Sequence, residues 1–226
     1  LDNISWPVGY FTPYLQFLFN YFEYGVSLGL SNIVTSDNDW NQLFDFLSTC
    51  EYNKLLGLSW KDNPINLDFM KFLHRNPDIY TLNIDSCLRS THKDIIAELS
   101  ALIRDSKRLT HFSASGTRSF YVGPLILDVF DACVGHPTLQ TVNIPCQIAG
   151  SGMLQMVMLT VVAESPLKMF NFEGFCPNNA KNLSKLLKEI AKYKNRIKIP
   201  FPTLDVLRCV KFKKMTNDEH NQLREL

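Results

Sequence analysis

Short pairs of apolar residues, separated by one residue, recur at a nearly constant interval along this chain of 226 residues. The first members of successive pairs lie 28, 26, 30, 30, 28 and 27 residues apart. An interval of this size is typical of repeat proteins, in which each unit buries its apolar side against the next. The pairs are Leu28-Gly-Leu30, Leu56-Gly-Leu58, Leu82-Asn-Ile84, Phe112-Ser-Ala114, Val142-Asn-Ile144, Phe170-Asn-Phe172 and Ile197-Lys-Ile199.

Another apolar residue stands three positions before most of these pairs, as in Ile79-x-x-Leu82-x-Ile84-x-x-Cys87. This is the L-x-x-L-x-L-x-x-N/C pattern of leucine-rich repeats, and Cys87 alone fills its last position cleanly. Alternate residues of a strand point to opposite faces, so the apolar pair points inward and the residues between point out. We therefore expect strands near 1–5, 27–31, 55–59, 81–85, 111–115, 141–145, 169–173 and 196–199.

A helical period follows each strand. Apolar residues at offsets 0, 3, 4 and 7 place four side chains on one face of a helix. The clearest sets are Trp40, Leu43, Phe44, Leu47; Ile126, Val129, Phe130, Cys133; Leu154, Val157, Met158, Val161; and Leu183, Leu186, Leu187, Ile190. Each unit is therefore expected to contain one strand and one helix.

Units of this length with a full helix indicate an α/β leucine-rich-repeat solenoid of the ribonuclease-inhibitor-like class. We expect a right-handed β-α superhelix shaped as a horseshoe, with parallel strands on the concave face and helices on the convex face. The array is expected to occupy 1–199 and a helical closing segment 200–226, with a short helix over 203–213 and another after Thr216. No polar capping unit precedes the first repeat, so we expect further repeats upstream.

Several other classes of protein do not fit the composition. No apolar run approaches the roughly 18 residues of a membrane-spanning helix. The six cysteines are widely spaced, as expected for reduced thiols inside a cell, and Cys133-x-x-His136 offers two of the four ligands of a structural zinc site. Neither a phosphate-binding glycine loop nor a metalloprotease motif occurs. We therefore expect no metal and no cofactor.

The residues expected on the concave face are mostly small and polar. Only Asp85, His111, Ser113 and Ser115 resemble a nucleophile with its base. Side chains two apart on a strand lie roughly 6 to 7 Å from each other, and an open face excludes no water, so we expect no catalytic residues and no enzyme. The candidate partner-binding residues are Asn83, Asp85, His111, Ser113, Ser115, Asn143, Asn171, Glu173 and Lys198.

Charge is distributed unevenly, although the net charge is +1. Residues 1–60 carry a net charge of −5 and residues 181–226 a net charge of +7. One expected helix face carries Lys181, Lys185, Lys188 and Lys192, which either face solvent or bind an acidic partner such as anionic lipid headgroups. Nucleic acid is not expected, because no stacking aromatic residues alternate with the basic ones.

The tail carries a more specific resemblance. The segment Ile199-Pro-Phe-Pro-Thr-Leu-Asp-Val206, the basic stretch over 208–214 and the Thr216-x-x-Glu219 capping box resemble the end of the repeat domain in the CARMIL family of actin-regulating scaffolds. This resemblance implies a cytoplasmic protein associated with the cytoskeleton or the inner face of the plasma membrane. It also implies actin-regulatory protein partners, a regulator of actin capping, and dimerisation through helices that flank the C-terminus.

Two functions follow from these observations. The first is a non-catalytic protein interaction scaffold, with CARMIL-like regulation of actin capping and assembly at the membrane. The second is a substrate-recognition or inhibitor module of a larger assembly, such as a ubiquitin ligase adaptor. An F-box-like helical segment upstream would favour the second.

Overall fold

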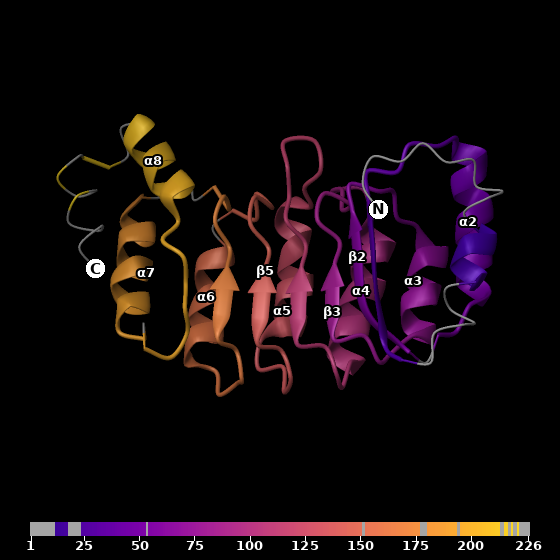
Figure 1. Cartoon of the computed structure of the whole chain (residues 1–226). Helices are drawn as coiled ribbons and strands as arrows, with labels where there is room; N and C mark the ends of the chain where they lie inside the picture. Colours follow the sequence, from indigo (N-terminus) through magenta and orange to yellow (C-terminus); the bar gives the residue numbers. More distant parts are fainter. Residues whose placement is uncertain are drawn as a thin grey trace.

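Strands and helices alternate along most of the described chain, which ends in two successive helices (Figure 1). The computed structural model describes residues 12–17, 24–52, 54–150, 152–176, 180–193, 195–212, 215, 216, 218 and 221. Residues 12–17 are helical, and within them Leu15 is fully buried. No helix in these ranges is long and apolar enough to cross a membrane.

Within the described ranges, six strands form one parallel sheet whose spatial order, β1 to β6, is their order along the chain. Each strand therefore pairs with its predecessor and its successor, and the order contains no reversal of the kind found in doubly wound sheets. The strands are β1 (Val26–Ser31), β2 (Leu55–Lys61), β3 (Thr81–Asn83), β4 (His111–Ser113), β5 (Thr141–Asn143) and β6 (Met169–Asn171).

The helices lie on one side of this sheet (Figure 1). We call the uncovered side the open face. The α-helices are α2 (Asp37–Thr49), α3 (Leu67–Arg75), α4 (Lys93–Asp105), α5 (Ile126–Cys133), α6 (Gly152–Val162), α7 (Ala180–Ala191) and α8 (Thr203–Lys211), and a 3-10 turn, η1 (Gly123–Leu125), precedes α5. The expected α/β class, with parallel strands alternating with helices, is confirmed.

The expected phase of the second repeat is wrong by two residues. Leu28 pairs with Leu58, and Leu30 pairs with Trp60, so the inward pair of β2 is Leu58-Ser-Trp60. A register shift between Val26 and Ser27 leaves one extra residue in β2. Leu55, at the start of β2, is fully buried as well.

Four helices were each expected to bury a set of four apolar residues. Three of them do so, and α6 does not. The sets on α2 and α7 are buried as expected, and α5 buries Ala132 in addition to its set. Helix α6 instead buries Met153, Val157, Thr160 and Val161. This helix is apolar on nearly every side, so its sequence does not specify which face packs against the core. Met153 and Thr160 are buried where Leu154 and Met158 were expected to be.

The expected strand over 196–199 is reduced to one bridge between Met169 and Lys198. Phe170 N donates to Lys198 O at 3.0 Å, and Lys198 N donates to Lys168 O at 2.8 Å. Pro200 has no N–H group, so pairing cannot continue beyond this point. The expected strand over 1–5 and the helix after Thr216 lie largely outside the described residues.

Buried side chains tie consecutive repeats together at the edge where the strands end. Asn63 Nδ2 donates to Leu30 O at 3.0 Å, and its Oδ1 accepts from Ile33 N at 2.8 Å. The thiol of Cys87 donates to Trp60 O at 2.7 Å, and Gln147 Nε2 donates to Ala114 O at 2.5 Å. Once the inward pair of β2 is taken as Leu58-Ser-Trp60, Asn63 occupies the last position of the repeat pattern, as Cys87 and Gln147 do in their own repeats. The expectation that Cys87 alone fills this position is therefore wrong.

At the opposite edge, where the strands begin, side chains also bond to backbone groups of the preceding repeat. Asn76 accepts from Tyr52 N at 2.6 Å and donates to Cys50 O at 3.3 Å, just beyond the end of α2. His136 Nε2 lies 2.9 Å from Ile103 O near the end of α4. These side chains pair backbone groups that helix ends leave unsatisfied, and they link each helix end to the next repeat.

Candidate interaction surfaces

A chain of hydrogen bonds crosses the open face from β3 to β6. Ser113 Oγ donates to Asp85 Oδ1 at 2.7 Å. Asn143 Nδ2 donates to Ser113 Oγ at 2.8 Å and to Ser115 Oγ at 3.1 Å. Asn171 Nδ2 then donates to Asn143 Oδ1 at 2.9 Å. The parallel register sets these side chains side by side, and the structure thereby brings together five of the nine expected residues.

Asp85 is the acceptor at the start of this chain. Its Oδ1 also accepts from the backbone N–H of Ser115 at 2.7 Å, and its Oδ2 lies 3.9 Å from Lys61 Nζ. Asn83 Oδ1 accepts from the backbone N–H of Asp85 at 3.0 Å. The carboxylate is therefore occupied by a hydroxyl, a backbone amide and a cation, which fixes its orientation on the face.

His111 stands apart from this chain. Its Nδ1 lies 2.8 Å from Thr110 Oγ1, and the ring is exposed. The Ser113 hydroxyl donates directly to Asp85, so its proton is directed to a carboxylate and not to an imidazole. A serine nucleophile needs a general base in hydrogen-bond contact, itself oriented by a third group. This set has no histidine between the serine and the carboxylate, because His111 contacts Thr110 instead.

Glu173 and Lys198 lie at the far end of the open face. Glu173 N donates to Asn171 Oδ1 at 3.3 Å, and Glu173 Oε1 accepts from Leu204 N at 2.8 Å in the first turn of α8. A carboxylate at this place favours the helix, because unpaired N–H groups and the positive end of the helix dipole lie there. Lys198 is exposed and bridges β6 through its backbone.

The four lysines of the expected basic face are exposed along α7. Lys192, in the turn just after α7, pairs with Glu189 at 2.8 Å. The opposite side of α7 buries Leu183, Leu186 and Leu187. The basic face therefore points away from the core, where it is accessible to an acidic surface.

The side chains of Cys133 and His136 both form hydrogen bonds with backbone carbonyl groups. The thiol of Cys133 donates to Val129 O at 3.3 Å, and His136 lies against Ile103 O. Burial raises the pKa of the Cys133 thiol to about 12, so the metal-binding thiolate is disfavoured. Across the described ranges, no group of three or more His, Cys, Asp or Glu residues is arranged to hold a metal ion.

The sequence reading missed a second surface, on α8. Asp205 is almost completely buried and accepts from Gly174 N at 2.7 Å and from Cys176 N at 2.9 Å. Burial raises the pKa of this carboxyl to about 6, against the opposing effect of these backbone N–H groups. While Asp205 anchors one side of α8, the other side exposes Leu204 and Leu207. Leucines with a spacing of three were a signal that could have found this face.

Comparison with known proteins adds no assignment. No model of a known family matches this sequence, and no curated protein matches it. The open face, α7 and α8 are therefore the features that bear on function.

Proposed function

We propose that this chain is a non-catalytic protein interaction scaffold built on a leucine-rich-repeat solenoid, with a concave open face. The observation that carries the proposal is the repeated bond from the last position of the pattern to the preceding strand, made by Asn63, Cys87 and Gln147. Each bond satisfies a buried carbonyl between repeats. This supports repeats that stack in one direction and leave the sheet free for a partner.

The open face suits docking better than chemistry. Its polar side chains bond to one another, which reduces the conformational entropy lost when a partner binds. The imidazole of His111 is directed at Thr110 and not at Ser113 Oγ, and the Asp85 carboxylate that accepts the Ser113 proton is itself held by a backbone amide. A polar surface that carries a few acceptors and exposed hydroxyls can bind the surface of another protein, and we infer that the open face is such a binding surface.

The tail supports the CARMIL-like form of the proposal. Asp205, in the proline-flanked segment that carries the resemblance, holds α8 against the loop after β6. We propose that the tail closes the array and that the chain acts in a cytoplasmic scaffold for actin-regulatory proteins. The exposed lysines of α7 would then face an anionic membrane surface, and the helices at the C-terminus would join two copies.

Affinity capture with matched variants tests this function. Thr81 is exposed on β3, and Thr81→Arg places a large cation on the open face, whereas Asn41→Arg does the same on the outside of α2. We expect actin-regulatory proteins among those retained by the wild type and by Asn41→Arg, and their loss with Thr81→Arg. Capture that is equal for all three chains would contradict a role for this face.

Two further results would redirect the proposal. Recovery of ubiquitin ligase subunits in place of actin regulators would favour a ligase adaptor. Turnover of any substrate that disappears in both His111→Ala and Ser113→Ala would replace the scaffold with an enzyme.

A further inference from the structure

A hollow of about 620 Å³ lies between α8 and the loops that follow β4, β5 and β6. It is at the edge toward which the strands point, where the loop between β4 and α5 rises highest and α8 crosses above α7 (Figure 1). The loops contribute Thr117, Arg118, Ile148 and Cys176, among others. This hollow is separate from the hydrogen-bonded chain on the open face.

One face of α8 borders the hollow with a spacing suited to a docking partner. Leu204, Leu207, Arg208, Lys211 and Phe212 stand at offsets 0, 3, 4, 7 and 8, so they share one side of the helix. Their apolar members are about half exposed: Leu204 54%, Leu207 49% and Phe212 58%. Exposed apolar side chains gathered in one place mark an interaction site more often than scattered ones.

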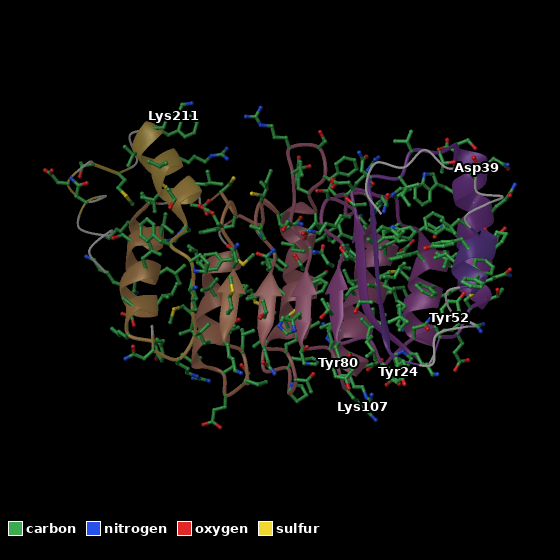
Figure 2. All side chains as sticks on the ribbon, viewed as in Figure 1. Tyr24, Asp39, Tyr52, Tyr80, Lys107 and Lys211 are labelled. Carbon is green, nitrogen blue, oxygen red and sulfur yellow. The ribbon has the colours of Figure 1, made fainter. Side chains whose placement is uncertain are left out.

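Positive charge surrounds this apolar surface. Arg118, Arg208 and Lys211 line the hollow, and Figure 2 shows Lys211 at the outer end of α8. Among the described residues, none of the three forms an ion pair with a carboxylate. Arg208 instead contacts Cys176 Sγ at 2.7 Å and lies 5.9 Å from the centre of the Phe212 ring.

The one acidic residue that lines the hollow does not offset this charge. Asp205 is 1% exposed, and both of its carboxylate oxygens accept backbone N–H groups. In the described part of the chain, these three cations therefore have no carboxylate partner. Charge complementarity then favours an occupant that carries carboxylates.

The loops that form the hollow are held in unusual conformations. Cys146, Ile148 and Cys176 all have positive φ, at 60°, 54° and 59°, and all three line the hollow. Such a φ is rare for a β-branched residue and is retained only where the surroundings enforce it. Gly150 N donates to Phe175 O at 2.8 Å and ties the loop after β5 to the loop after β6. The hollow is thus preformed.

We propose that this hollow docks a short segment of a partner protein in which apolar side chains are flanked by Asp or Glu. The apolar side chains would pack on Leu204, Leu207 and Ile148, and the carboxylates would reach Arg118, Arg208 and Lys211. The inference rests on the proposed scaffold function and gives it a second docking site. A bilayer surface fits less well, because Ile148 and Cys176 line a recess that a flat surface does not enter.

Selection from a displayed library of random short peptides on the chain of 226 residues tests the proposal. We expect the enriched peptides to combine Leu, Ile, Phe or Trp with Asp or Glu. Leu207→Asp should weaken their binding by more than about tenfold, since it removes apolar contact and adds a like charge. Leu159→Asp on α6, at a leucine 44% exposed, should leave their binding unchanged.

Charge reversal supplies an independent measurement. Arg208→Glu with Lys211→Glu should turn the selection toward peptides rich in Lys or Arg, whereas Lys188→Glu on α7 should not. Enriched peptides without acidic residues, or peptides that bind Leu207→Asp as well as wild type, would overturn the proposal. So would self-association or binding to phosphatidylserine vesicles that Leu207→Asp abolishes, because the occupant would then be a second copy or a membrane.

The two proposals can fail separately. If Thr81→Arg removes the captured actin regulators but Leu207→Asp leaves the selected peptides bound, the scaffold survives and the hollow is not a docking site. If the peptides depend on Leu207 but no protein depends on Thr81, the open-face function fails and the hollow remains.

Discussion

Asn63 satisfies two backbone groups from the neighbouring repeat while almost completely buried. A leucine of similar size at this position would leave Ile33 N and Leu30 O without partners. A buried polar group without a partner costs about 1 to 3 kcal/mol. We therefore expect Asn63→Leu to lower the free energy of unfolding by about 2 to 4 kcal/mol, measured by urea denaturation.

Asn41 supplies the control for this prediction, because it is exposed on α2. Asn41→Leu should change the free energy of unfolding by less than about 0.5 kcal/mol. If both variants unfold at the same urea concentration, the bonds between repeats contribute little to stability.

The buried carboxyl of Asp205 predicts that the stability of the fold depends on pH. Burial raises its pKa from 3.8 to about 6, so between these values the folded chain holds more of the proton than the unfolded chain does. The contribution of Asp205 to the free energy of unfolding is therefore fully present below about pH 4. It falls as pH rises and levels off above about pH 6, with a total loss of about 3 kcal/mol.

The difference between wild type and Asp205→Asn isolates this effect, because asparagine does not titrate. The free energy of unfolding of the wild type, relative to that of the variant, should decrease from pH 4 to pH 6.5. A difference that is constant over this range, or that increases, would show that the carboxyl is ionised throughout and that the hydrogen bonds to its oxygens outweigh burial.

Sequence reasoning placed the residues of the open face, but not their bonds. The alternation of apolar and polar residues puts Ser113, Asn143 and Asn171 on one side of three strands, and neighbouring strands are in register. Which side chain donates to which depends on rotamers, and no pattern specifies those. The position of Asn63 in the repeat pattern was missed because Leu56-Gly-Leu58 and Leu58-Ser-Trp60 both match the apolar pair. Only the strand register shows which of the two points inward.

At the scale of single elements, helix faces were predictable where polar residues define the opposite side. Helix α7 alternates leucines with lysines, so only one stripe is apolar. Helix α6 contains three methionines and few polar residues, so its face is set by contacts with α5 and α7.

Two methionines of α6 test which face packs. Met153 is fully buried, whereas Met158 is partly exposed. Met153→Ala should lower the free energy of unfolding by about 2 to 5 kcal/mol, and Met158→Ala by less than about 1 kcal/mol. Thermal unfolding of the two variants measures this difference. A larger loss in Met158→Ala would restore the face that the sequence suggested.

For the molecule as a whole, each strand pairs with its neighbours in sequence, and α2 through α8 pack in the same succession. The stability of such an array is approximately a sum of repeat terms and neighbour terms. A loss of packing at one end should therefore remain local, unlike in a domain with a single shared core. This distinguishes a solenoid from a compact α/β sheet of the same composition.

Leu183→Ala tests this locality, because Leu183 is fully buried in α7 near the end of the array. The cavity should cost about 2 to 5 kcal/mol. Backbone amides of β6, α7 and α8 should then exchange faster with solvent deuterium, while those of β2 and β3 keep their protection, because α7 does not support them directly. If protection falls equally from β2 to α8, the chain unfolds as one cooperative unit. The repeats would then share their stability over the full length, and the proposed solenoid would have to be replaced by a single fused core.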